Sequence, residues 1–206
     1  MIKYAVAASG GGSDFQSAVD GQKAGQIPNG QIVALFSNKV NAGALDRAKK
    51  AGIPAHFIDH TISQEARDKA ILEVLNESGA EFLFLAGYLK KISPAVIAKL
   101  PIYNIHPAHD MKKFGGKGMY GLAVHEAVIK AGEKTSGATI HEVDEIYDNG
   151  KILMQTPKVP VMDGDTPETL GARVLSAEHK LIPIFLNKLT TKMLEAKKTS
   201  ESNLSS

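Results

Sequence analysis

Short apolar runs alternate along the chain with longer segments of helical periodicity. Runs of four to eight apolar residues are typical of strands, and apolar residues recurring every three to four positions are typical of helices. Residues 82–86 read Phe-Leu-Phe-Leu-Ala, as expected for a strand covered on both faces. We expect strands at residues 4–8, 31–37, 55–59, 82–86 and 102–105, with helices near residues 15–24, 42–51, 63–78 and 94–100. This alternation predicts an α/β fold with a mostly parallel, twisted sheet flanked by helices.

The pattern loosens after residue 106. A loop rich in Gly and Lys spans residues 108–121, and a helix is expected over 121–131. Two strands, at 135–143 and 152–159, are expected around the turn sequence Asp148-Asn149-Gly150. A long helix is expected from Thr166-Pro167 to about residue 189, kinked at Pro183. We therefore expect one domain over residues 1–189 and a polar, disordered tail over 190–206.

The composition narrows the class of protein. With 206 residues, of which 43% are hydrophobic and 22% charged, the chain has the composition of a globular protein. A formal net charge of +2 indicates neither a nucleic-acid nor a membrane partner. The absence of cysteine excludes disulfides, thiolate zinc sites and a cysteine nucleophile. Since no apolar run approaches about 20 residues and no signal-peptide pattern is present, we expect a cytoplasmic location.

A glycine-rich loop, Ser9-Gly10-Gly11-Gly12-Ser13-Asp14, follows the first expected strand and opens a helix. Backbone N–H groups there can approach an anion, and the helix N-terminus favours negative charge. A dinucleotide fingerprint would need glycine at position 15, where Phe15 stands, and the P-loop pattern is also absent. The loop therefore favours a small phosphorylated metabolite over NAD or ATP. A glycine turn that only packs helix on strand is the alternative.

Asn104 and His106 end the fifth expected strand and point to the same face of the sheet. At the carboxyl end of a parallel strand, such a pair could hold a developing oxyanion. A polar strand end without chemistry is the alternative. No metal site is expected, because Pro107 would break a helix and no third ligand is placed beside His106 and His109. Four other histidines, at positions 56, 60, 125 and 179, are expected to be surface or core residues.

Two carboxylates, Asp148 and Glu178, lie in different sequence surroundings. Asp148 lies in a good turn sequence, and by itself it indicates only a turn. Glu178 lies on the apolar stripe of the last helix, formed by Leu170, Val174, Leu181 and Ile182. A carboxylate on such a stripe must find donors or reach a polar ligand, unless its head escapes to water.

Five motifs occur in order within residues 1–189. They are Ser-Gly-Gly-Gly-Ser-Asp-Phe-Gln (9–16), Phe-Ser-Asn-Lys (36–39), Leu-Ala-Gly-Tyr-Leu-Lys-Lys-Ile-Ser-Pro (85–94), Asn-Ile-His-Pro (104–107), and Gly-Ala-Thr-Ile-His (137–141) followed by Asp-Asn-Gly (148–150). Together they resemble the glycinamide ribonucleotide formyltransferases, a folate-dependent family of purine synthesis. The resemblance implies a Rossmann-like sheet with added C-terminal strands and a long C-terminal helix.

The resemblance also implies a reaction. The amine of glycinamide ribonucleotide would attack the formyl carbon of 10-formyltetrahydrofolate, the co-substrate, with no acyl-enzyme and no metal. Asn104 and His106 would stabilise the oxygen of the tetrahedral intermediate. Asp148 would pair with His106, raise its pKa so that it stays protonated, and assist proton movement.

Binding residues follow from the same resemblance. Gly12, Ser13 and Asp14 match the phosphate-binding turn, and Glu178 matches a ribose-contacting glutamate. The folate pocket would be lined by Leu89, Lys90, Lys91, Ile92 and Asn104, with Gln64 where relatives have an arginine and Arg67 one helical turn further on. The chain departs from the family pattern at Asp14, where asparagine is common, and over residues 108–113, Ala-His-Asp-Met-Lys-Lys.

Two other functions stay open at this point. A 10-formyltetrahydrofolate deformylase would use water in place of the amine, and a non-catalytic module would only bind a sugar phosphate. Methionyl-tRNA formyltransferases and the deformylases carry additional domains, for which this sequence offers no counterpart. In each case the expected partners are small molecules.

Overall fold

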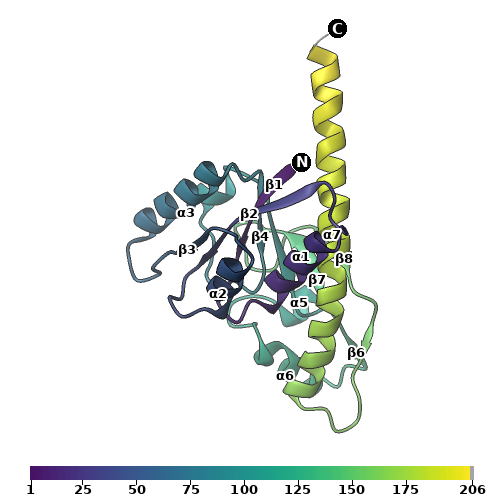
Figure 1. The fold of residues 1–206 in the computed structure, drawn as a ribbon. Coiled ribbons are helices and arrows are strands. Elements are labelled where there is room, and N and C mark those ends of the chain that lie inside the picture. The colour runs from purple at the N-terminus through teal and green to yellow at the C-terminus, as the bar shows by residue number, and fades with distance from the viewer. Residues whose placement is uncertain (205–206) are drawn as a thin grey trace.

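The computed structural model describes residues 1–204, which form a central sheet with helices on both faces (Figure 1). The strands are β1 (Ile2–Ala7), β2 (Gly30–Ser37), β3 (Ala55–Phe57), β4 (Phe82–Leu85), β5 (Ile102–His106), β6 (Thr135–Ser136), β7 (Thr139–Glu142), β8 (Ile152–Gln155) and β9 (Val159–Pro160). The helices are α1 (Ser13–Lys23), α2 (Gly43–Lys50), α3 (Gln64–Ser78), α4 (Pro94–Ile97), α5 (Met111–Phe114), α6 (Leu122–Lys130) and α7 (Pro167–Leu204). The first half follows the order that the hydrophobic pattern predicts.

Seven strands form the main sheet, in the order β3-β2-β1-β4-β5-β7-β8. Strands β1 to β5 pair in parallel, whereas β7 is antiparallel to β5 and β8 is antiparallel to β7. This arrangement confirms the predicted α/β class with added C-terminal strands. The carboxyl ends of β1, β4 and β5 lie at one edge, so the loops that follow them meet there.

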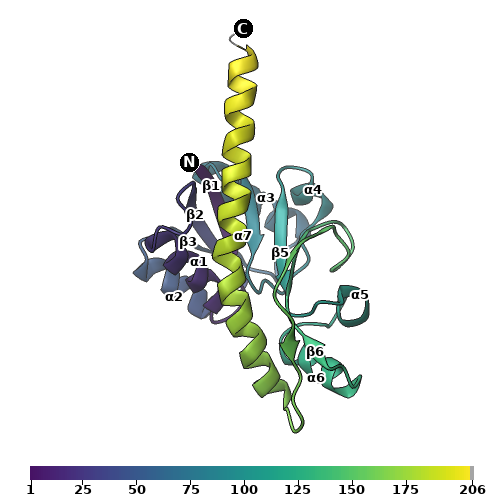
Figure 2. The same ribbon diagram turned by 90° about the vertical axis from the view of Figure 1, so that its right-hand side faces the viewer.

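Alternate residues of the central strands pack against helices on opposite faces. In β1, Tyr4 and Val6 belong to the core shared with α1 and α7, while Ala5 and Ala7 belong to the core shared with α3 and α4. All four side chains are fully buried. Figure 2 shows α7 crossing the first of these faces beside α1. The sheet is therefore covered on both sides, which explains its continuous apolar strands.

The two strands expected after residue 134 are each divided. Residues 135–143 contain β6 and β7, and residues 152–159 contain β8 and the start of β9. β6 pairs with β9 in a separate two-stranded sheet. At the division, the Thr156 hydroxyl accepts a hydrogen bond from the Ala138 N–H at 2.9 Å, and the Thr156 N–H donates to the Ala138 carbonyl at 3.0 Å. Periodicity alone cannot show that one extended segment serves two sheets.

The C-terminal helix is longer than the sequence predicts. We expected it to end near residue 189 and the tail to be disordered, but α7 continues to Leu204 and its end projects beyond the body of the molecule (Figure 1). The segment lacks glycine and proline, Thr190 is fully buried, and Lys197 forms an ion pair with Glu81. These contacts extend the helix where polar composition suggested disorder. Within residues 1–204 no helix is long and apolar enough to cross a membrane.

Candidate active site

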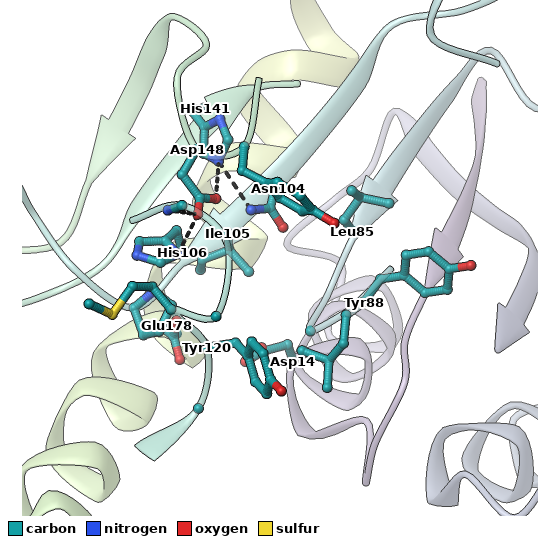
Figure 3. Close-up of a pocket in the computed structure, with 18 of the residues that line it drawn as sticks. Asp14, Leu85, Tyr88, Asn104, Ile105, His106, Tyr120, His141, Asp148 and Glu178 are labelled. Carbon is teal, nitrogen blue, oxygen red and sulfur yellow. Dashed lines mark hydrogen bonds and ion pairs between the residues drawn. The ribbon is translucent and has the colours of Figure 1, made fainter. Parts of the chain in front are cut away.

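A cavity of about 810 Å³ opens at the carboxyl ends of β4 and β5 (Figure 3). Its walls come from segments that are far apart in the sequence: the start of α1, the segment after β4, the end of β5, the loop before α6, the loop after β7, and α7. Asn104, His106, His141 and Asp148 gather on one wall, and Asp14 and Glu178 also line the cavity. This volume lies within the range of pockets that bind small organic molecules.

Asp148 joins two buried imidazoles. Its Oδ2 lies 3.6 Å from His106 Nδ1, and its Oδ1 lies 3.6 Å from His141 Nε2. The Gly116 N–H donates a third interaction, to Oδ2 at 2.8 Å. Burial alone would raise the pKa of Asp148, but its interactions with His141 and His106 and the hydrogen bond from the Gly116 N–H outweigh burial, so that pKa is lowered. Asp148 is therefore ionised at neutral pH.

His106 is held at both ring nitrogens. Its Nε2 lies 2.8 Å from the Phe114 carbonyl oxygen, which can only accept, so Nε2 carries a proton and donates it there. The side chain is 4% exposed, and this burial lowers the pKa of His106 despite the opposing effects of Asp148 and the Phe114 carbonyl. The pairing with Asp148 is as expected. The expectation that Asp148 keeps His106 protonated was wrong in its net direction, because burial has the larger effect.

The expected loop at 108–121 contains the short helix α5 and a tight turn that contacts both members of this pair. Phe114 supplies the carbonyl to His106, and Gly116 supplies the N–H to Asp148. Between them, a Cβ at Gly115 would lie 2.4 Å from the Met111 oxygen and 2.8 Å from the Asp148 Cβ. Only a residue without a side chain fits there unless the backbone shifts.

His141 is part of the site although the sequence did not assign it a role. β7 pairs antiparallel with β5 in the register that places His141 beside Asn104. The Asn104 Nδ2 lies 3.1 Å from His141 Nε2, and the His141 Nδ1 lies 2.7 Å from the Glu142 carbonyl oxygen. The motif at 137–141 was a signal for this region, but nothing local in it indicates which strand it would join.

Asp14 and Glu178 form an acidic wall of the same cavity. Glu178 is 6% exposed, and its pKa is raised well above the ordinary value by burial and by the charge of Asp14. Burial raises the pKa of Asp14 to about 6. The Asp14 Oδ1 lies 3.5 Å from His179 Nε2, and neither atom has a hydrogen-bond partner within residues 1–204. His179, expected to be a surface or core residue, thus faces Asp14.

The glycine loop is built for a close backbone approach. Gly12 has a φ of 74°, and a Cβ there would lie 2.7 Å from Ala44. α1 begins at Ser13, directly after it. The Ser9 hydroxyl bonds Asn38 and accepts the Leu89 N–H at 2.8 Å, which ties the loop to the segment after β4. Of the three residues expected at the phosphate turn, Asp14 lines the cavity, while Gly12 and Ser13 shape the turn beside it.

The segment expected to line a folate pocket does line the cavity, through Leu89, Lys90, Lys91 and Ile92. The Lys91 ammonium lies 5.7 Å from the centre of the ring of Tyr147, which also lines the cavity. Gln64 is placed elsewhere: it begins α3 and lines a separate shallow depression. The Arg67 guanidinium bonds the His60 and Ile62 carbonyls at the start of the same helix. Neither residue of α3 lies on the cavity wall.

The fold and this cavity agree with a known family. The Formyl transferase family matches residues 2–186, so the chain belongs to that family. The phosphoribosylglycinamide formyltransferase of Escherichia coli K12 is 32% identical over 190 residues, which cover 90% of this chain and 86% of that protein. A chloroplastic phosphoribosylglycinamide formyltransferase of Arabidopsis thaliana is 44% identical over 185 residues, 87% of this chain. The chain spans 62% of the length of this plant relative.

Solved structures give the same result. The glycinamide ribonucleotide transformylase 1 of Symbiobacterium toebii superposes with a TM-score of 0.86 at 33% identity, covering 93% of this chain and 89% of that one. The phosphoribosylglycinamide formyltransferase of Brucella melitensis has a TM-score of 0.81 at 39% identity, covering 92% and 95%. The Rossmann-like architecture expected from the motifs is therefore confirmed.

Proposed function

We propose that this protein transfers the formyl group of 10-formyltetrahydrofolate to the amine of glycinamide ribonucleotide, a step of purine synthesis. The observation that carries the proposal is the gathering of Asn104, His106 and Asp148 on one wall of a cavity that is also lined by Asp14, at the end of the glycine turn. The relatives that bear this activity in their names support it. We also propose the cytoplasmic location that the sequence led us to expect.

In this reaction the amine nitrogen forms a bond to the formyl carbon, and the bond from that carbon to N10 of the folate breaks. The carbonyl oxygen carries negative charge in the intermediate, and the Asn104 amide, partly exposed on the wall, is the donor we assign to it. One proton leaves the amine and one is returned to N10. His106 and Asp148 hold the proton in transit, because an imidazolium at 106 would be stabilised by the carboxylate 3.6 Å away.

In this scheme His106 also stabilises the negatively charged oxygen of the intermediate. Its neutral form donates Nε2–H to Phe114, so it offers the cavity no ring proton in that form. Once protonated, its charge stabilises the neighbouring oxyanion through space. Catalytic hydrogen bonds often tighten only in the substrate complex.

The two substrates would occupy opposite parts of the cavity. We assign the phosphate to the turn of Gly12, Ser13 and Asp14, and the ribose to Glu178, which explains a carboxyl group on an apolar helix stripe. The pterin would lie against the segment 89–92 and Asn104. Gln64 and Arg67 are left out of this assignment because they lie away from the cavity wall.

The test is a steady-state assay with both substrates, following formylated ribonucleotide, tetrahydrofolate and formate. Formylation that requires both substrates supports the proposal. Formate release that is independent of the ribonucleotide would instead show a deformylase, and ligand binding without turnover would show a binding module. His106→Ala should lower kcat by roughly 10²- to 10⁴-fold. The matched control is His56→Ala, on β3 and outside the cavity, which should retain full activity.

A further inference from the structure

The Asn104 amide has a partner that the proposed reaction does not use. Its Nδ2 donates to His141 Nε2 at 3.1 Å, and that nitrogen is free to accept because His141 Nδ1 donates its proton to the Glu142 carbonyl at 2.7 Å. The two contacts together select one tautomer of the imidazole. His141 is 2% exposed, so its ring cannot rotate without moving the strands around it.

The amide group of Asn104 has two N–H bonds but only one of them is used by His141. With one N–H held, the amide plane is set, and the second N–H and the Oδ1 are left for the cavity that Asn104 lines (Figure 3). Without this anchor the terminal torsion of asparagine is broad and roughly two-fold, so the donor and the acceptor could exchange places. A carbonyl oxygen turned toward an oxyanion would repel it.

We propose that His141 is a positioning residue for the formyl transfer: it accepts one N–H of Asn104 and thereby directs the second N–H toward the oxygen of the formyl donor. The inference rests on the proposed function, since it assumes that Asn104 meets that oxygen. The register of β7 against β5 makes it possible, because Asn104 and His141 are paired residues of adjacent strands. No contact between His141 and a substrate is required.

Two variants with side chains of similar length separate the effect of the hydrogen bond from the effect of packing. His141→Gln keeps an acceptor oxygen at about the position of Nε2, while His141→Met fills the space without one. We expect His141→Met to lower kcat roughly 10-fold, because a misdirected oxyanion donor forfeits part of the 10²- to 10³-fold that such a donor contributes. The KM for the phosphorylated substrate should change less than about two-fold, and His141→Gln should recover most of the activity. The corresponding His56→Gln and His56→Met variants, outside the cavity, should have no effect.

A double-mutant cycle decides whether His141 acts through Asn104. In an Asn104→Ala background, His141→Met should have almost no further effect on kcat, because the group that it positions is gone. An equal further loss in that background would overturn the proposal. So would a coupling found only with Asp148→Asn, because His141 Nε2 also lies 3.6 Å from Asp148 and could act through that carboxylate.

A measurement independent of activity keeps the inference separate from the proposed function. The side-chain amide signals of Asn104, assigned by their loss in Asn104→Asp, should move in His141→Met and stay near their wild-type position in His141→Gln. Unmoved signals in His141→Met would refute the hydrogen bond even if the enzyme proved to be a deformylase. If His141→Met fails to fold, the wild-type protein and His141→Gln provide the test. Asn104 amide signals at the chemical shifts of a solvent-exposed asparagine in both proteins would refute the hydrogen bond equally.

Discussion

Asp14 offers a test of the acidic wall through protein stability. Its carboxyl group is 13% exposed, faces Glu178 and has a pKa of about 6, raised from 3.8 by burial. A carboxyl group whose pKa is raised by folding destabilises the folded state when it ionises. Replacing it with the neutral amide in Asp14→Asn removes that penalty. We therefore expect the variant to be more stable than the wild type at neutral pH.

The magnitude follows from the two pKa values. Stability associated with this group is fully present below pH 3.8 and is lost as the pH rises through about 6. The loss of stability reaches about 3 kcal/mol above pH 7, whereas at pH 4 it is less than about 1 kcal/mol. Because the charge of Asp14 raises the pKa of Glu178, that pKa should also fall in the variant. Part of the gain in stability would then come from the easier ionisation of Glu178.

Urea unfolding at pH 4 and at pH 7.5 measures this difference. The free energy of unfolding of Asp14→Asn, relative to wild type, should rise by about 2 kcal/mol between the two pH values, with an unchanged slope in urea. Asp20→Asn is the matched control, since Asp20 is exposed on the same helix, and its effect should stay within about 0.5 kcal/mol at both pH values.

An equal effect at both pH values would contradict a titrating carboxyl group at position 14. If Asp14→Asn changes the unfolding free energy equally at pH 4 and pH 7.5, the Asp14 carboxyl group is not a buried, reluctantly ionised group in the folded protein. The effect would then come from packing or hydrogen bonding of the amide. The pH-dependent part is what distinguishes the two, because only a titrating group can produce it.

Three further outcomes are expected. Gly115→Ala should lower kcat at least roughly 10-fold, measured in the two-substrate assay, because its Cβ would collide with Met111 and Asp148 and displace the turn that holds His106. Asp148→Asn should lower the free energy of unfolding at pH 7 and lose that effect as the pH falls, in urea titrations, because a carboxyl group with a lowered pKa stabilises the fold only while ionised. Phe185→Ala should destabilise the protein by about 3–5 kcal/mol in the same titrations, since the ring is buried between Phe84 and Tyr103.

The hydrophobic pattern was sufficient for the first half of the fold. Most of the parallel strands are short apolar runs between helices, and a strand such as β4 is buried along its entire length. These are local properties of the sequence, so they can be recognised without knowing the neighbours. The end of α7 was missed because its stability depends on partners distant in the sequence, such as Glu81 for Lys197.

The site was predicted in part for the same reason. Asn104 and His106 alternate on one strand, so their common direction could be inferred from two adjacent positions. The link from Asn104 to His141 depends on the pairing of β5 with β7, which separates the two residues by 37 positions. The Phe114 carbonyl depends on the course of a loop. Gln64 was assigned by analogy to a family position, and the path of α3 places it away from the cavity.

The backbone at Asp148 explains why these distant groups depend on one another. Asp148 has a φ of 51°, a conformation that costs most residues with side chains about 1 kcal/mol or more. Aspartate tolerates this conformation better than most residues, and here it lies in a turn sequence. The cost is offset by the contacts of the carboxylate, which receives the Gly116 N–H and lies between two imidazoles. The contacts of the Asp148 carboxylate therefore stabilise the conformation of the loop after β7. Those contacts exist because β5, β7 and the turn at 114–116 meet at this carboxylate.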